Sequence, residues 1–190
     1  MSKSVLALSE TIDKEARTLI YNQVRSCPRW RWDHATNLGD TTESPNPILK
    51  VITDFKRAPE CTDEIYELGC TITTMQKEIV KQLTGRDAVE IEWLNFQITF
   101  EGHHGRYHTD CGQDETRVTV VTMITPDWKP EYGGAFYIEI DDQQYEFEFQ
   151  AGMSVAFDSS LRHTGVGARI GSPYPRLMCC CMYVLDQITH

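Results

Sequence analysis

The chain has 190 residues and a formal charge of -10, because 18 Lys and Arg residues stand against 28 Asp and Glu residues. This length suits one domain with a substantial core, so residues 1–190 are predicted to form a single domain. Affinity for nucleic acid comes mainly from Lys and Arg that neutralise phosphate charge, so the acidic balance argues against a nucleic-acid partner. The seven cysteines form no Cys-x-x-Cys pair, which predicts reduced thiols and a cytoplasmic location. No apolar stretch is long enough to cross a membrane, so no membrane partner is predicted.

The N-terminal third of the chain predicts one helix and one long loop. Acidic residues just after Ser9 are typical of a helix start, and the apolar residues that follow recur at helical spacing until Pro28 ends the run. From residue 30 to residue 59 this pattern is lost among Asn, Gly, Asp, Thr, Ser and Pro, which predicts a long loop. A short apolar run at 48–52 predicts one strand within it.

A second predicted helix is followed by a series of strands. The helix begins at Thr62 and ends at Gly85, and only Gly69 and a group of threonines lower its helix propensity. Beyond Gly85 the period of the apolar residues changes from 3.6 to 2 over a predicted strand at residues 89–100, and the phase switches after Trp93, which suggests a bulge or a strand covered on both faces. The remaining predicted strands are residues 118–124, 135–140, 145–149, 153–157 and 177–185. Two helices followed by antiparallel strands favour an α+β fold, in which the helices lie against one face of a sandwich or barrel.

The segment His108-Thr109-Asp110 is the most informative motif. Residues two apart on an extended backbone project to the same side, so this imidazole and this carboxylate can bind one ion. A third donor, His163, stands just past another predicted strand and is within reach across the mouth of a small barrel. Two imidazoles and one carboxylate leave other metal positions open, as in non-haem Fe(II) oxygen chemistry, whereas a structural zinc site has four protein ligands.

A candidate for binding a carboxylate ligand lies further along the chain. Arg176 opens the last predicted strand, and the planar fork of its guanidinium suits a bidentate hold on a carboxylate in a buried pocket. Arg169 is a rival, six residues after His163. We prefer Arg176, because the glycines on both sides of Arg169 indicate a turn rather than a strand.

At these residues the sequence resembles the Fe(II)/2-oxoglutarate-dependent dioxygenases, specifically the prolyl 4-hydroxylase-like branch. The resemblance covers about half the chain and rests on an ordered set of features: His108-Thr109-Asp110, Gly133-Gly134, the segment 155–163, and the strand led by Arg176. It implies a double-stranded β-helix, a jelly-roll or cupin-like barrel, with its core at about residues 89–186. Residues 1–88 would then supply buttressing helices and a loop.

The resemblance also implies ligands and a reaction. His108, Asp110 and His163 would bind Fe(II), and Arg176 would bind the far carboxylate of 2-oxoglutarate. O2 would be the other reactant, with ascorbate as a candidate reductant. The enzyme would release succinate and CO2 while it hydroxylates an unactivated C–H bond, in a prolyl residue of a peptide or protein or in a free amino acid. Asp110 favours hydroxylation over halogenation, because halogenating relatives lack this carboxylate.

Several points stay open at the level of sequence. Relatives often supply a tyrosine to 2-oxoglutarate, but that position falls near Met123 and Ile124, so Tyr107, Thr99 and Tyr137 are the candidates for a hydroxyl partner. One alternative function is the oxidation of another small metabolite. Another is a barrel that binds a metal or ligand without turnover and acts as a sensor. The oligomeric state is not predicted.

Overall fold

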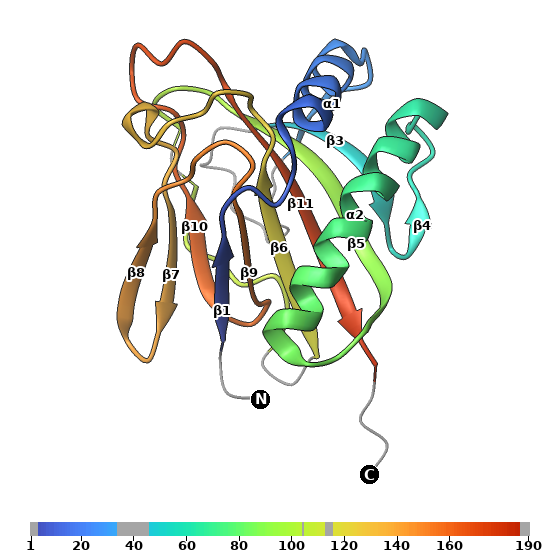
Figure 1. The fold of residues 1–190 in the computed structure, drawn as a ribbon, viewed down its shortest axis with the longest axis vertical. Helices are drawn as coiled ribbons and strands as arrows, with labels where there is room; N and C mark the ends of the chain where they lie inside the picture. The colour runs from blue at the N-terminus through green and yellow to red at the C-terminus, as the bar shows by residue number, and fades with distance from the viewer. Residues whose placement is uncertain (1–3, 34–45, 104, 113–115, 187–190) are drawn as a thin grey trace.

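Two antiparallel sheets form the centre of the protein, and two helices cover the outer face of the larger sheet (Figure 1). The computed structural model describes residues 4–33, 46–103, 105–112 and 116–186. The large sheet has the order β1-β9-β6-β11-β5-β3-β2, with β4 paired to β3; its strands are β1 (Val5–Leu8), β2 (Arg31–Asp33), β3 (Asn46–Thr53), β4 (Lys56–Arg57), β5 (Ala88–Thr99), β6 (Arg117–Met123), β9 (Ser154–Asp158) and β11 (Arg176–Leu185). The small sheet has the order β10-β7-β8, and its strands are β7 (Phe136–Ile140), β8 (Gln143–Phe147) and β10 (Arg162–Gly165). The predicted α+β class is confirmed.

Helix α1 (Lys14–Ser26) begins later than the sequence predicts. The Asp13 side chain accepts a hydrogen bond of 2.9 Å from the backbone N–H of Ala16, which is an N-cap arrangement. The apolar residues ahead of Ser9 form β1, which pairs with β9 at the edge of the large sheet. The predicted start at Ser9 is therefore wrong, because a strand and a turn occupy the residues before the cap.

Helix α2 (Asp63–Thr84) has both of its predicted ends. The Thr62 hydroxyl accepts a hydrogen bond from the backbone N–H of Ile65, and Gly85 takes a left-handed conformation, with φ of 67°, that ends the helix. Among the described residues, no helix is long and apolar enough to span a membrane.

Gly69 allows α2 to approach the large sheet closely. A Cβ atom at Gly69 would lie 2.8 Å from Leu94 Cδ2 and 2.9 Å from Val51 Cγ1, and both of these side chains are fully buried. We therefore expect Gly69→Ala to destabilise the protein, because overpacking costs about 1–3 kcal/mol and alanine gains only about 1 kcal/mol in helix propensity. Urea unfolding measures the change. Thr71→Ala, on the exposed face of α2, is the control and should alter stability by less than about 0.5 kcal/mol; a Gly69→Ala variant as stable as the wild type would contradict the expectation.

The strands follow the predicted series with two kinds of difference. The sequence does not predict β1, β2, β4 or β10, because each has four residues or fewer and shows too little alternation. Strand β8 begins two residues earlier than predicted. Asp141 and Asp142 both have positive φ, at 49° and 62°, so they form a two-residue turn that fixes the start of β8 at Gln143.

The apolar residues of β5 shift from odd to even positions along the strand but stay on one side of the sheet, since Ile91 and Leu94 belong to the same helix-side cluster. The pairing of β5 with β11 shifts register between Met182 and Tyr183, which marks a β-bulge. Beyond the bulge, Leu94, Phe96 and Ile98 are buried on the helix side of the sheet. The residues between them, which include Asn95 and Gln97, therefore face the gap between the two sheets.

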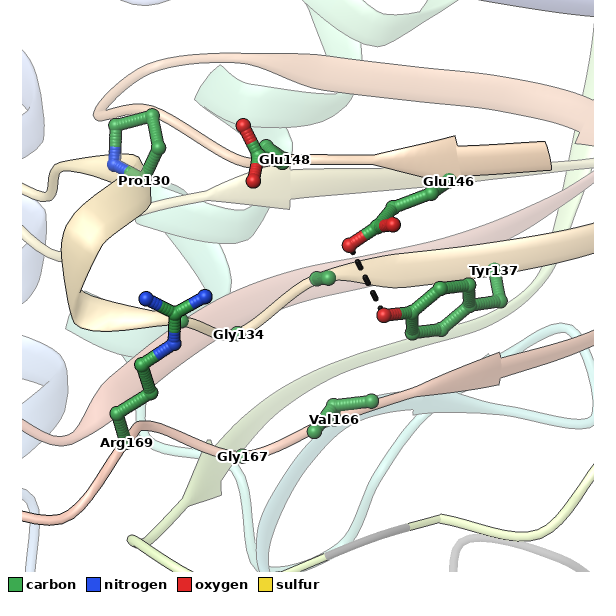
Figure 2. A pocket seen from close by; sticks show the side chains of 10 residues that line it. Pro130, Gly134, Tyr137, Glu146, Glu148, Val166, Gly167 and Arg169 are labelled. Carbon is green, nitrogen blue, oxygen red and sulfur yellow. Dashed lines mark hydrogen bonds between the residues drawn. The ribbon is translucent and has the colours of Figure 1, made fainter.

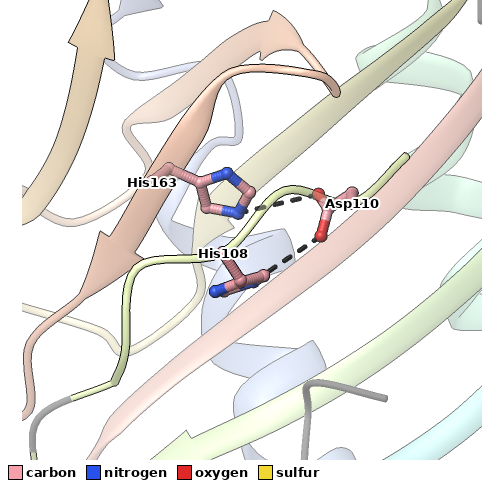
Figure 3. Close-up of side chains that lie close together, drawn as sticks. All are labelled: His108, Asp110 and His163. Atoms are coloured by element: carbon pink, nitrogen blue, oxygen red, sulfur yellow. Dashed lines mark ion pairs between the residues drawn. The ribbon is translucent and has the colours of Figure 1, made fainter. Parts of the chain in front are cut away.

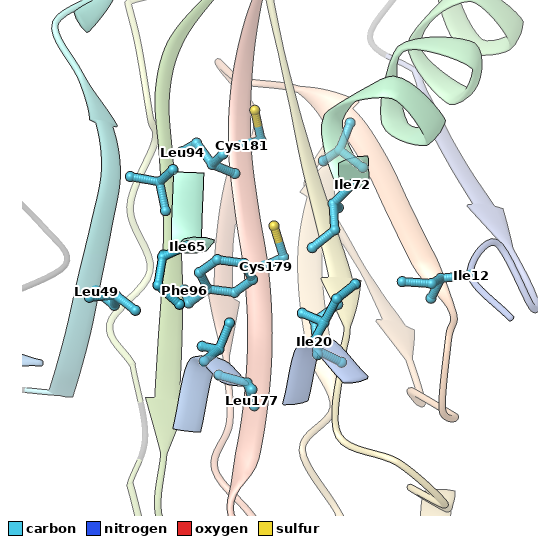
Figure 4. Close-up of a cluster of buried hydrophobic side chains, with 14 of the residues drawn as sticks. Ile12, Ile20, Leu49, Ile65, Ile72, Leu94, Phe96, Leu177, Cys179 and Cys181 are labelled. Carbon is cyan, nitrogen blue, oxygen red and sulfur yellow. The ribbon is translucent and has the colours of Figure 1, made fainter. Parts of the chain in front are cut away.

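The large sheet separates two apolar clusters. The cluster on the helix side contains alternate residues of β11, among them Leu177, Cys179 and Cys181 (Figure 4). The other cluster fills the gap between the sheets, and its buried members include Val121, Phe136, Phe157 and Met178. All seven cysteines are free thiols, and two of those on β11 are fully buried core residues. The gap between the sheets is where the predicted site residues lie.

Candidate metal centre

The backbone brings His108 directly opposite His163. The N–H of His108 donates to the carbonyl of His163 at 3.0 Å, and the N–H of His163 donates to the carbonyl of His108 at 2.8 Å. Residues paired in this way project their side chains to one face, and the two ring centroids are 4.4 Å apart. Asp110 lies two residues beyond His108 and shares that face, and its N–H is held by the carbonyl of Ser159 at 3.0 Å.

Three potential ligand atoms converge in this arrangement (Figure 3). His108 Nε2 lies 3.6 Å from Asp110 Oδ1, and His163 Nε2 lies 3.7 Å from Asp110 Oδ2. One ligand atom from each residue can be chosen so that all three lie within 4.8 Å of one another. Two ligands that are each about 2.1 Å from a metal at a right angle lie roughly 3 Å apart, so a small adjustment of the side chains lets one ion contact all three.

Both imidazoles are oriented by the same backbone device. His108 Nδ1 lies 2.9 Å from the carbonyl of Arg106, and His163 Nδ1 lies 2.9 Å from the carbonyl of Leu161. A carbonyl only accepts, so each Nδ1 carries a proton and the Nε2 of each ring is the nitrogen that faces Asp110. Burial lowers the pKa of His163, outweighing the opposite effect of the Asp110 carboxylate, and His108 adds to the lowering. The neutral ring that results is the metal-binding form.

The site is closed on one side and open on the other. The His163 ring packs against Phe157 and Phe136, with centroids 4.6 Å and 5.4 Å away. Side-chain exposure rises from 5% for His163 through 11% for Asp110 to 29% for His108. A ligand therefore reaches the three atoms from the His108 side.

Arg176 lies in the same gap between the sheets. Its guanidinium is close to Gly165, since a Cβ there would lie 3.1 Å from Nη1, and Gly165 follows His163 by two residues on β10. A Cβ at Gly134 would lie 2.9 Å from Arg176 Cδ, so both glycines make room for this side chain. Burial lowers the pKa of Arg176 to about 10, which leaves it charged at neutral pH. Its Nε has no hydrogen-bond partner, and no carboxylate within the described ranges pairs with it.

Comparison with known proteins adds evidence on the fold. No protein-family model matches the sequence, and no curated protein matches it either. Among solved structures, a Pseudomonas putida prolyl-4-hydroxylase has 18% sequence identity and a TM-score of 0.67, over 98% of this chain and 95% of that one. A Trichoplax adhaerens prolyl hydroxylase, in complex with a peptide of hypoxia inducible factor, has 13% identity and a TM-score of 0.71, over 95% and 83% of the two chains. The epimerase SnoN, in complex with Fe3+, alpha ketoglutarate and nogalamycin RO, has 11% identity and a TM-score of 0.68, over 96% and 79%.

The chain has the fold of the Fe(II)/2-oxoglutarate-dependent oxygenases. The predicted double-stranded β-helix buttressed by N-terminal helices is therefore confirmed. The donor set of this oxygenase fold also suits its ligands. Two imidazoles and one carboxylate fit Fe(II), and a buried guanidinium with an unpartnered Nε fits a carboxylate such as that of 2-oxoglutarate.

The rival arginine lies elsewhere in the oxygenase fold. Arg169 is exposed and lines a cavity of about 210 Å³ together with Tyr137, Glu146 and Glu148 (Figure 2). None of the three converging ligand residues lines this cavity. The Tyr137 hydroxyl donates a hydrogen bond of 2.9 Å to Glu146. The structure therefore places Arg169 and the candidate hydroxyl of Tyr137 together in a different place from Arg176.

The structure also separates the other two candidate hydroxyl partners of 2-oxoglutarate, Tyr107 and Thr99. Tyr107 precedes His108, so its side chain points to the opposite face; there its hydroxyl bonds to the side chain of Gln144 and its ring lies 4.8 Å from Arg162 Cζ. The position of Tyr107 thus gives no support to its predicted contact with 2-oxoglutarate. Thr99 pairs directly with Arg176 across β5 and β11, so it shares the face of Arg176.

Two polar residues on β5, Asn95 and Gln97, are not identified as site residues from the sequence, although they lie in one row with the candidate Thr99. Asn95, Gln97 and Thr99 face the gap between the sheets, and their partners on β11 are Cys180, Met178 and Arg176. The carboxamides of Asn95 and Gln97 are half-buried and form no hydrogen bond within the part of the chain that the structure describes. In an alternating strand such residues are indistinguishable from solvent-facing ones, so only the sheet pairing identifies them.

Proposed function

We propose that the protein is an Fe(II)- and 2-oxoglutarate-dependent dioxygenase that hydroxylates an unactivated C–H bond. The observation that carries this proposal is the placement of two ligand types in one gap. The His108, Asp110 and His163 donors converge on one side of it, and the guanidinium of Arg176, whose Nε has no hydrogen-bond partner, lies beside Gly165, two residues after His163 on β10. A barrel that only binds a metal has no need of a buried, unpaired cation beside the metal ligands.

Each residue has a distinct part in the proposed reaction. His108 and His163 present Nε2 to Fe(II), and Asp110 supplies the negative charge. Arg176 orients 2-oxoglutarate by its far carboxylate, and Thr99 is the hydroxyl best placed to assist. Iron and 2-oxoglutarate, when bound, would supply the chemistry that activates O2, which oxidises 2-oxoglutarate to succinate and CO2. The apolar cluster between the sheets, which includes Phe157 and Met178, keeps water from this side of the site.

The proposed substrate is a prolyl residue in a peptide, or a free amino acid. Support for a peptide comes from the Trichoplax prolyl hydroxylase, which has this fold and was solved with a peptide bound. The carboxamides of Asn95 and Gln97 also support a peptide substrate, because each carboxamide offers a donor and an acceptor to a peptide group. The spacing between these two residues on the strand also matches the repeat of an extended peptide. SnoN has the same fold and was solved with nogalamycin RO, which supports oxidation of a small molecule as the second candidate.

Succinate release tests the proposal. Anaerobically purified protein is mixed with Fe(II), 2-oxoglutarate and O2, alone and with either a proline-rich peptide or free L-proline. We expect succinate above a metal-free control, and we expect the peptide to raise its rate more than L-proline does. The absence of succinate under all three conditions, combined with metal binding that Asp110→Ala abolishes, would favour a sensor that binds metal without turnover.

A further inference from the structure

We propose that Thr119, supported by Ser159, holds the Asp110 carboxylate so that only Oδ1 is left for the metal. The inference rests on the proposed metal site and adds two positioning residues to it. Both are serine or threonine residues outside the three ligands, and the sequence analysis assigns no role to either of them.

The contacts of this group are short, and its two hydroxyl residues are fully buried. Thr119 Oγ1, on β6, donates to Asp110 Oδ2 at 2.7 Å. The hydroxyls of Thr119 and Ser159 are 2.8 Å apart, and both residues are inaccessible to solvent. The carbonyl of Ser159 also accepts the N–H of Asp110 at 3.0 Å. Asp110 is thus held through its main chain and its side chain by the same pair of residues.

The direction of these hydrogen bonds follows from the groups involved. An ionised carboxylate only accepts, so the single O–H of Thr119 points to Asp110. Ser159 must then donate its own O–H to Thr119 Oγ1. Hydrogen bonds that run in one direction polarise one another, which strengthens the final contact with the carboxylate.

This arrangement has a consequence for metal binding. A carboxylate that binds through both oxygens takes two positions of a metal, whereas one that binds through a single oxygen takes one. Each oxygen of Asp110 lies near one imidazole, Oδ1 at 3.6 Å from His108 Nε2 and Oδ2 at 3.7 Å from His163 Nε2. What distinguishes them is that Oδ2 accepts the Thr119 hydroxyl, whereas Oδ1 accepts no hydrogen bond from the residues in the described ranges. With Oδ2 held, Asp110 uses one position, and more positions stay free for 2-oxoglutarate and oxygen.

Mn(II) binding to purified protein tests the inference, with free Mn(II) measured by paramagnetic resonance. Thr119→Val removes the hydroxyl and keeps the volume, and we expect it to weaken Mn(II) binding by about 10- to 100-fold. Thr119→Ser keeps the hydroxyl and should stay within about 3-fold of wild type. Thr122→Val is the matched control, because Thr122 is also buried on β6 and makes two hydrogen bonds, to Gln76 and Ser154, on the opposite face.

The outcomes separate this inference from the proposed function. If Thr119→Val and Thr122→Val bind Mn(II) alike while Asp110→Ala loses it, Thr119 is not a positioning residue and the metal site stands. If wild type and Asp110→Ala bind Mn(II) alike, the metal site and the inference both fail. 2-Oxoglutarate should tighten Mn(II) binding in wild type and Thr119→Ser but less in Thr119→Val; an equal effect in all three would overturn the claim that Thr119 keeps a metal position free. Thermal unfolding without metal checks that the two valine variants are similarly folded.

Discussion

Asp110→Ala should abolish metal binding and 2-oxoglutarate turnover without unfolding the protein. Loss of a residue that merely orients a metal ligand typically weakens metal affinity by about 10- to 100-fold, so loss of a ligand itself should exceed about 100-fold. Asp110 is the only carboxylate in the converging donor set, so Asp110→Ala removes the one anionic ligand from it. Titration with Mn(II) and measurement of succinate give the two readouts.

A carboxylate removed elsewhere is the control for Asp110→Ala. Glu148 is exposed in the wall of the cavity that Arg169 lines, which we call the outer cavity. Glu148→Ala changes the net charge by the same amount as Asp110→Ala, and it should leave metal affinity and succinate release within about 2-fold of wild type. Wild-type metal affinity in Asp110→Ala would show that the ion binds at another place. Equal losses in both variants would indicate a general effect of charge.

The helices and long strands could be predicted because their signals are local. Thr62 and Gly85 mark the two ends of α2 through their own caps, and the unbroken apolar run at residues 177–185 is typical of a buried strand that includes three cysteines. Strand β10 could not be predicted in this way, because its few residues are held by pairing with β7 and with the His108 segment, which are distant in sequence. The same holds for β1, which completes an edge of the large sheet beside β9.

In the candidate site, too, the residues placed by local sequence signals could be predicted, whereas those placed by long-range contacts could not. A spacing of two places His108 and Asp110 on one face of an extended segment, and the structure brings both to His163. The same rule places Tyr107 on the opposite face, which argues against its predicted contact with 2-oxoglutarate. Thr119 could not be assigned from the sequence, because its contact with Asp110 depends on how β6 lies beneath the loop that carries the carboxylate.

Arg176→Ala should nearly eliminate 2-oxoglutarate binding while leaving Mn(II) affinity unchanged. Removing one partner of a buried charge pair costs on the order of 3–5 kcal/mol, which is two to three and a half orders of magnitude in affinity. Arg176→Lys should recover only part of this, since an ammonium is a point charge without the planar fork. Arg169→Ala is the control, because Arg169 is exposed and lines the outer cavity. Loss of 2-oxoglutarate binding in Arg169→Ala, with normal binding in Arg176→Ala, would reverse the assignment of the two arginines.

Although replacing Arg176 should weaken 2-oxoglutarate binding, it should increase the stability of the ligand-free protein. Arg176 is 5% exposed, its Nε has no hydrogen-bond partner, and its depressed pKa of about 10 reflects the cost of burying the charge. Arg176→Met keeps much of the volume and removes the charge, so it should raise the free energy of unfolding by about 1–3 kcal/mol. Urea unfolding of the metal-free protein measures this change. If Arg176 served the structure of the free protein, Arg176→Met would destabilise it. Because we infer that Arg176 serves to bind an anionic ligand, we expect Arg176→Met to stabilise the free protein and to abolish binding of the ligand.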